Sequence, residues 1–280
     1  MEECMKECFI DLKNSTSINY LERLLGRSKN DKIATICHHN CSVLLNINDY
    51  KHNGRYPFRS ILTSTEFLSS VFSMFNFIMI FICYNLIFSN NNKSVSFTGL
   101  YKLQYIISLI CWISSTLFHI YDTWYTRCMD YFTGYIFFIV TLYIFTLRSL
   151  YLFKFNQKNI TFFRNYMVPL LRIWTLLHIF YMYYIDFNYV FHKVSCIIIY
   201  IMILCNWTAY IIKMIEFIHT RYLIIYILFI LSGGIIEVMD FPPLFYLLDS
   251  HAIWHFLSGL AVPFYYLFIS KDIVNETVNQ

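Results

Sequence analysis

The chain has 280 residues, of which 58% are hydrophobic and 20% are aromatic, whereas only 14% are charged. This composition excludes a soluble globular domain, in which charged residues make up about a quarter of the chain. The net charge of +4 is small and the basic residues are scattered through loops, so nothing supports a nucleic-acid-binding surface. We therefore expect an all-α protein that crosses a membrane several times.

Residues 1–65 differ in kind from the rest, because they are polar and contain no apolar run long enough to cross a bilayer. We expect them to form a short extramembrane segment. An even number of cysteines in this segment favours two disulfides in an oxidising compartment, with a pairing that the sequence does not reveal. The stretch CHHNC at residues 37–41 leaves zinc binding as the alternative. The disulfide candidates are Cys4, Cys8, Cys37 and Cys41.

Seven apolar stretches follow. A bilayer core of about 30 Å requires roughly 20 apolar residues in a helix, and each stretch meets this requirement. We expect residues 66–270 to form a domain of seven transmembrane helices and residues 271–280 to form a tail. The expected spans are 66–89, 101–120, 131–153, 168–186, 189–210, 221–239 and 251–269.

The loops indicate an orientation. Nine Lys and Arg residues occupy the loops after helices one, three and five together with the tail, whereas the other loops hold only Arg127 and Lys193. The positive-inside rule places the first set in the cytosol. The N-terminal segment and the start of the last span are then lumenal. A lumenal N-terminus of this length normally requires a signal peptide, and MEECMKECFI lacks one, so we expect a missing first exon or a first span that inserts in reverse.

Five side chains are predicted to lie at one membrane level. Ser115 and His119 are four residues apart near the lumenal end of the second helix, and Asp130 begins the third helix just after the turn. His251 and His255 are again four apart, at the lumenal start of the last helix. An i, i+4 pair lies on one helix face. That the five groups also converge in the membrane plane is a hypothesis.

Three histidines form a ligand set known from catalytic zinc sites, because three protein ligands leave the fourth position open for water. In that interpretation His119, His251 and His255 bind Zn²⁺, Asp130 takes a proton and Ser115 orients the water or polarises the substrate. Interfacial histidines with ordinary hydrogen bonds are the structural alternative. A catalytic Ser115–His119 pair is a weaker alternative, because the spacing supplies no oxyanion hole.

Further acids lie near the same turns. Asp122, Glu237 and Asp240 are candidates for supporting the ligands from outside. We expect Asp122 to be structural, whereas the roles of Glu237 and Asp240 are open. Glu237 lies inside the sixth span, where a charged group is costly and usually functional.

Two long motifs resemble a known family. SSTLFHIYDTWYTRCMDYF, residues 114–132, and EVMDFPPLFYLLDSHAIWH, residues 237–255, are similar to motifs of the GPI-anchor lipid-remodelling proteins, the Per1-like or post-GPI-attachment-to-proteins factor 3 family. NGRYPF at 53–58 and DFNY at 186–189 resemble two shorter family motifs. The resemblance covers essentially residues 50–270.

The resemblance implies a seven-helix fold shared with alkaline ceramidases and adiponectin-type receptors. It implies that His119, His251 and His255 hold Zn²⁺ while Asp130 and Ser115 contact its water. The implied activity is phospholipase A2-like hydrolysis of the sn-2 acyl ester in the lipid of GPI-anchored proteins. It would take place at a lumenal site of a multi-pass protein in the endoplasmic reticulum or Golgi membrane, with GPI-anchored proteins and membrane lipids as partners.

The chain also departs from that family. Tyr121 and Arg127 stand where the family has Arg and Glu, so contacts to the substrate head group are expected to differ. Leu45 replaces a third lumenal cysteine, which affects the disulfide pattern. A seven-helix receptor or scaffold with structural zinc is the alternative function. A cation transporter is a third, disfavoured because the spans lack breaks at mid-membrane.

Overall fold

The computed structural model describes residues 1–52, 54–62, 64–88 and 97–278, with side chains described up to residue 272. Asn53 of the NGRYPF stretch, residue 89 of the first expected span and the last two residues of the expected tail lie outside these ranges. So does Lys93, one of the nine basic residues assigned to the cytosolic side.

Within the described residues, seven helices are long and apolar enough to cross a membrane, which confirms the predicted all-α class and the number of spans. Apart from isolated β-bridges, the described residues contain no β structure. The π-helical turns η1 and η3 continue α4 and α7. The elements are α4 (Phe67–Cys83), η1 (Tyr84–Phe88), α5 (Thr98–Ile120), α6 (Trp124–Leu152), α7 (Gln157–Phe180), η3 (Tyr181–Ile185), α8 (Tyr189–Met214), α9 (Ile218–Met239) and α10 (Ser250–Val278).

Two spans begin seven or more residues earlier than hydropathy predicts, because polar residues cap them. α6 begins at Trp124 instead of residue 131, since the hydroxyl of Thr123 accepts a hydrogen bond from the backbone N–H of Thr126 at 3.3 Å and the hydroxyl of Thr126 accepts from the backbone N–H of Thr123 at 3.0 Å. α7 begins at Gln157 instead of residue 168, since Asn156 accepts from the backbone N–H of Asn159 at 2.8 Å. Asp130 therefore lies inside the helix and not at its start.

The chain folds as two compact units. Unit 1 contains the N-terminal segment and parts of five spans, and unit 2 contains the rest. Unit 1 comprises residues 1–79, 112–130 and 228–261, and unit 2 comprises residues 80–111, 131–227 and 262–280.

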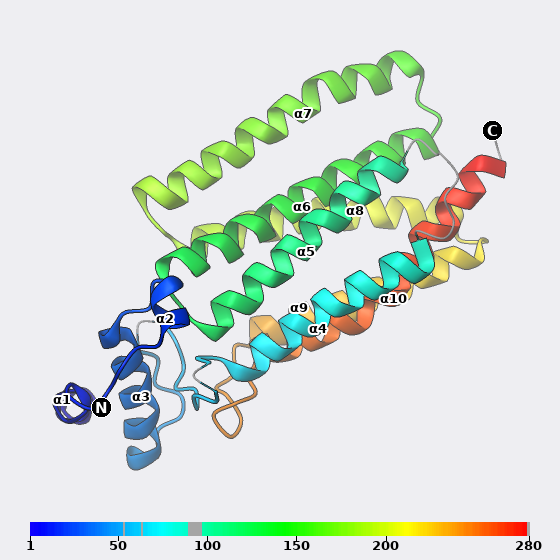
Figure 1. Ribbon diagram of the computed structural model, residues 1–280. Coiled ribbons are helices and arrows are strands. Elements are labelled where there is room, and N and C mark those ends of the chain that lie inside the picture. The colour runs from blue at the N-terminus through cyan, green and yellow to red at the C-terminus, as the bar shows by residue number, and fades with distance from the viewer. Residues whose placement is uncertain (53, 63, 89–96, 279–280) are drawn as a thin grey trace. The chain divides into compact units, whose positions relative to one another are not determined.

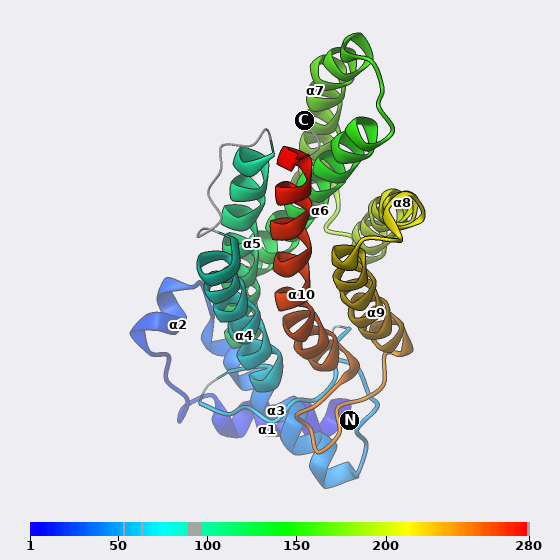
Figure 2. The ribbon, with the colours of Figure 1, turned by 90° about the vertical axis from the view of Figure 1, so that its right-hand side faces the viewer.

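The N-terminal segment of unit 1 consists of α1 (Glu2–Leu12), α2 (Tyr20–Leu24) and α3 (Lys29–Leu45). α1 packs against α3, as Figures 1 and 2 show. Two disulfides, Cys4–Cys41 and Cys8–Cys37, join these helices. The alternative of zinc in the CHHNC stretch is therefore wrong, because both of its cysteines are oxidised.

Glu22 holds the start of this segment together. Its carboxylate caps α2 through the backbone N–H of Asn19 and forms ion pairs with Arg27 at 3.1 Å and Lys32 at 3.0 Å. Burial by itself raises the pKa of Glu22, but these hydrogen bonds and positive charges lower that pKa overall.

The loop between α9 and α10 lies against the segment that leads into α4, as the orange and pale blue chains of Figure 1 show. The backbone N–H of Arg59 donates to the carbonyl of Tyr246 at 2.8 Å. Asp240 accepts from Lys51 at 2.5 Å, and its carbonyl accepts from the hydroxyl of Tyr56 at 2.6 Å. These contacts tie the start of α4 and the start of α10 to the same extramembrane layer of unit 1.

Unit 2 is held by a buried ion pair among its apolar spans. Arg148 of α6 donates two hydrogen bonds to Asp272 of α10, at 2.8 and 2.7 Å. The hydroxyl of Tyr210 also donates to Asp272, and His219 lies 2.8 Å from that hydroxyl. The hydrogen bonds and the positive charge of Arg148 offset the free-energy cost of burying the Asp272 carboxylate among apolar spans.

Candidate metal centre

Three histidines from two helices meet in unit 1. His119 lies in the last turn of α5, and His251 and His255 lie one turn apart at the start of α10. Asp249 determines where α10 begins, because its Oδ1 accepts a hydrogen bond from the backbone N–H of Ala252 at 2.8 Å. The i, i+4 spacing then places both rings of α10 on one face, which is directed towards His119.

The Nε2 atoms of the three rings converge. His119 Nε2 lies 3.1 Å from His255 Nε2 and 3.3 Å from His251 Nε2, and the latter two atoms are 2.9 Å apart. His119 is 1% exposed and His255 is 5% exposed, whereas the side chain of His251 is 34% exposed. Two of the three rings are therefore buried, and the third reaches the surface. These three residues form a group that could hold a metal ion.

Two carboxylates orient two of the three rings by contacting their Nδ1 atoms, on the side of each ring away from the convergence point. Oε2 of Glu66, the residue before α4, lies 2.6 Å from Nδ1 of His119, and Oε2 of Glu237 in α9 lies 3.1 Å from Nδ1 of His251. Burial by itself raises the pKa of Glu66, but the hydrogen bond and charge of His119, with the charge of Arg55, lower it to about 2. Glu66 is therefore ionised at neutral pH.

An ionised carboxylate can only accept hydrogen bonds, so Nδ1 of His119 carries a proton, and Nδ1 of His251 faces a carboxylate oxygen of Glu237 in the same way. When these two rings are neutral with the proton on Nδ1, their Nε2 atoms present lone pairs to the convergence point. Lone pairs that face one another at 3.3 Å repel, whereas a cation between them would make the arrangement favourable. The carboxylate–histidine arrangement matches the way that proteins orient metal-binding imidazoles.

His255 is held by different means. Its ring meets Trp112 edge to face at a centroid distance of 5.3 Å, and its backbone carbonyl accepts from Asn76 of α4 at 2.6 Å. Its Nδ1 is buried without a hydrogen-bond partner among the described residues. The ring orientation of His255 therefore depends on packing and on the backbone.

Two glycines allow the helices to approach closely enough for these contacts. A Cβ at Gly259, one turn after His255, would lie 2.5 Å from the ring of Phe75 in α4. A Cβ at Gly233, one turn before Glu237, would lie 2.7 Å from the ring of Trp254 in α10. Both separations are too short for any side chain larger than hydrogen.

Ser115 and Asp130 lie beside the histidines. Ser115 is 3% exposed, and its hydroxyl lies 3.1 Å from that of Ser73 in α4. The Asp130 carboxylate is hydrogen-bonded to Ser115 and lies within electrostatic range of His119 and His251. The structure thus brings all five residues of the predicted constellation into one region of unit 1.

The remaining acids separate into different environments. Glu237 contacts His251, as described above, whereas Asp122 pairs with Arg55 and Arg127, and Asp240 pairs with Lys51. Sequence reasoning missed Glu66. Its signal was an acidic residue directly before an apolar run, at the same membrane level as the histidines.

The comparisons with known proteins all point to the same family. The sequence model of the Per1-like family matches residues 26–273. The chain is 28% identical over 221 residues to the "GPI-specific phospholipase A2-like PGAP3" of Homo sapiens, covering 78% of this chain and 66% of that protein. The protein of the same name from Cricetulus griseus is 29% identical over 167 residues, which cover 59% of this chain and 50% of that protein. The "Post-GPI attachment to proteins factor 3" of Drosophila melanogaster is 27% identical over 222 residues, which cover 76% of this chain and 64% of that protein. The chain thus spans less than two thirds of the length of these relatives.

Proposed function

Because the chain belongs to the Per1-like family, we propose that it remodels the lipid of GPI-anchored proteins by zinc-dependent hydrolysis of the sn-2 acyl ester. The observation that carries this proposal is the convergence of three Nε2 atoms, two of them on rings that carboxylates orient from behind. The names of the relatives, which refer to a GPI-specific phospholipase A2-like protein, supply the substrate class.

Zinc fits this donor set. Imidazole nitrogens lie about 2.0–2.1 Å from zinc, so two of them in a tetrahedral site are separated by roughly 3.3–3.4 Å. The observed separations of 2.9, 3.1 and 3.3 Å are close to that size. Three neutral imidazoles leave the fourth position open, which is typical of catalytic zinc sites.

When bound, zinc lowers the pKa of a coordinated water to about 7 and polarises a carbonyl oxygen. The protein supplies the other groups. We assign to Asp130 the general acid–base role, in which it accepts the proton of the attacking water and returns it to the departing alkoxide. Ser115 is hydrogen-bonded to Asp130 and adjacent to Ser73, so its hydroxyl is held in place to orient the water or the ester carbonyl.

The depth of the site suits an ester substrate. His119 lies at the end of one span and His251 at the start of another, which is where the acyl chain of a lipid meets its head group. The acyl chain can then stay in the bilayer while the ester reaches the histidines. We further propose that this end of the spans faces the lumen of the endoplasmic reticulum or Golgi, as the distribution of basic residues predicts.

The experiment compares the full chain with two site variants in proteoliposomes that contain a diacyl GPI. Zinc content and released fatty acid are measured together. His251→Ala is expected to lose both, whereas Asp130→Asn is expected to retain zinc and lose about 10²- to 10⁴-fold in rate. Asp240→Asn is the control, because Asp240 pairs with Lys51, away from the histidines.

Two outcomes would contradict the proposal. Wild-type protein that binds zinc but releases no fatty acid would favour a receptor or scaffold with structural zinc. A wild-type protein that binds no metal would contradict both the zinc-dependent hydrolase and the scaffold with structural zinc.

A further inference from the structure

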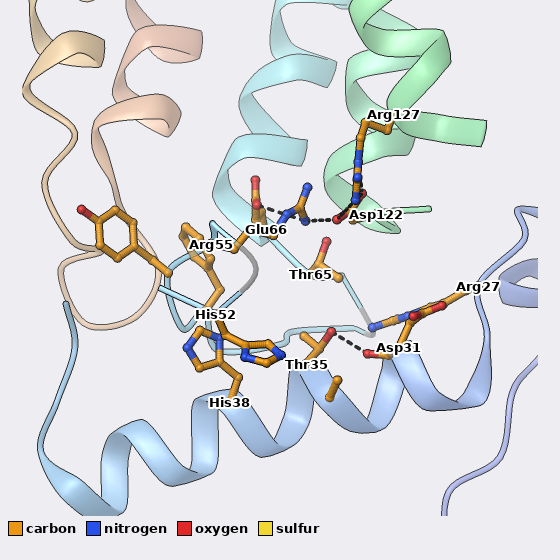
Figure 3. Close-up of a pocket in the computed structure, with 13 residues that line it drawn as sticks. Arg27, Asp31, Thr35, His38, His52, Arg55, Thr65, Glu66, Asp122 and Arg127 are labelled. Atoms are coloured by element: carbon orange, nitrogen blue, oxygen red, sulfur yellow. Dashed lines mark hydrogen bonds and ion pairs between the residues drawn. The ribbon is translucent and has the colours of Figure 1, made fainter. Parts of the chain in front are cut away.

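A polar cavity of about 190 Å³ lies in unit 1 between α3, the loop before α4 and the turn between α5 and α6. This volume corresponds to roughly six water molecules at about 30 Å³ each, which is more than a lone ion requires. Figure 3 shows α3 along one side of the cavity, with charged side chains from the other elements directed into it. The charged residues that line the cavity are Arg27, Arg55, Arg127, Asp31, Glu66 and Asp122.

The cavity and the metal centre share Glu66. One oxygen of this carboxylate binds Nδ1 of His119, and the other lies 3.7 Å from Arg55. The cavity is therefore separated from the histidines by a single side chain. It lies between the N-terminal segment and the ends of the spans, where the polar part of a lipid would project if its ester were at the histidines.

The charges of the cavity alternate in sign. Arg55 pairs with Asp122 at 2.5 Å, and Arg127 pairs with both oxygens of Asp122 at 2.9 Å (Figure 3). A simple anion would meet carboxylates as well as guanidinium groups, and an apolar ligand would strip water from both. A ligand that carries a phosphate together with hydroxyl or amino groups matches both signs, because guanidinium binds phosphate and carboxylates accept from hydroxyl and amino groups.

We propose that this cavity binds the phosphate-bearing, polyhydroxylated head group of the lipid whose ester reaches the histidines. This inference rests on the proposed function and assigns a head-group site to it. Arg127 stands where the family has a glutamate, so a positive charge replaces a negative one and adds a hydrogen-bond donor to this cavity.

Arg55 and Arg127 are the residues best placed to contact the phosphate. Their side chains are 29% and 35% exposed, whereas that of Arg27 is 2% exposed and is engaged by Glu22. Ion pairs with partial exposure contribute little to stability, so Arg55 can exchange a carboxylate for a phosphate at small cost. Without Arg55, Asp122 still pairs with Arg127 and Glu66 still binds His119.

The test measures head-group binding without catalysis. Glycerophosphoinositol, which has no acyl ester to hydrolyse, is titrated by calorimetry into the full chain in detergent micelles. Arg55→Gln and Arg127→Gln are each expected to weaken binding about tenfold or more, as the loss of a charge-assisted hydrogen bond predicts. Lys51→Gln is the matched control, because Lys51 belongs to the same loop but pairs with Asp240. Inorganic phosphate and myo-inositol, added separately, are expected to bind more weakly than the complete head group.

Several results would overturn the proposal. They are absence of head-group binding by the wild type, equal weakening by Lys51→Gln, or unchanged binding by both arginine variants. Equal affinity for inorganic phosphate alone would show an anion site without a polyol site. Head-group binding by a chain that releases no fatty acid would leave this cavity intact and reject only the proposed hydrolysis, so the two failures are distinguishable.

Discussion

Replacing Glu66 by Gln tests how the metal centre is built. The change keeps the size of the side chain and an acceptor oxygen for Nδ1 of His119, but it removes the negative charge. Without that charge His119 becomes a less basic ligand, and a metal ion at its Nε2 is bound less tightly. We therefore expect a loss of zinc affinity without loss of the fold.

The magnitude follows from the geometry. Substitution of a carboxylate behind a metal-binding histidine typically costs 10- to 100-fold in metal affinity. The bond from His119 to Glu66 is short, at 2.6 Å, and charge-assisted. Since Gln still accepts, Glu66→Gln is expected to cost about tenfold, or about 1.4 kcal/mol, and Glu66→Ala nearer to 100-fold. Glu237→Gln is expected to cost less than Glu66→Gln, because its bond to His251 is 3.1 Å long and its side chain is 21% exposed.

The assay is zinc competition with a chromophoric chelator, performed on each purified full-length variant in the same detergent. Asp240→Asn serves as control, because it neutralises a carboxylate that pairs with Lys51 outside the histidine group. If Glu66→Gln and Glu66→Ala both bind zinc as tightly as Asp240→Asn does, the reasoning about the outer carboxylates is refuted.

Three further predictions concern stability. Arg148→Ala is expected to destabilise the protein by about 3–5 kcal/mol, because it leaves Asp272 buried among apolar spans without its ion pair; a loss below about 1 kcal/mol in denaturant titration would contradict this. The pKa of Glu22 is lower in the folded protein than in the unfolded chain, so its stabilisation is present above the ordinary carboxyl pKa and lost as pH falls through the folded value. Protease resistance of the N-terminal segment is therefore expected to fall in acid, and Glu22→Gln to reduce that pH dependence; the same pH profile in this variant would assign the effect to other groups. Cys8→Ser is expected to cost about 2–5 kcal/mol of segment stability by opening the disulfide to Cys37, measured as faster proteolysis, and an unchanged rate would oppose that role.

Hydropathy predicted the seven spans because each must cover the apolar core of a bilayer, but it did not predict where they begin. The start of α7 is set by the cap at Asn156 and the start of α6 by the hydroxyl groups of Thr123 and Thr126, and local hydrogen bonds of this kind leave no trace in mean apolarity. The disulfide pairing could not be predicted from the sequence either. The cysteines of α1 and those of α3 are both four residues apart, so the pairing depends on the relative direction of the two helices.

More of the candidate site than of the helix boundaries could be predicted from the sequence. The i, i+4 spacing placed His251 with His255, and span direction placed His119 at the same level. Their convergence required the packing of α4, α5 and α10, which depends on close contacts such as that of Gly259 with Phe75. Glu66 escaped notice because an acid before an apolar run looks like an ordinary helix boundary, and only the structure shows its carboxylate on His119.

Zinc-dependent ester hydrolysis is tested by mass-spectrometric measurement of the fatty acid that the full chain releases from a diacyl GPI, before and after removal of metal. We expect the wild-type protein to release one fatty acid per GPI, a strong chelator to abolish release, and stoichiometric zinc to restore it. Release that is unaffected by complete removal of metal, or absent from the zinc-loaded protein, would show that the histidines do not form a catalytic zinc site.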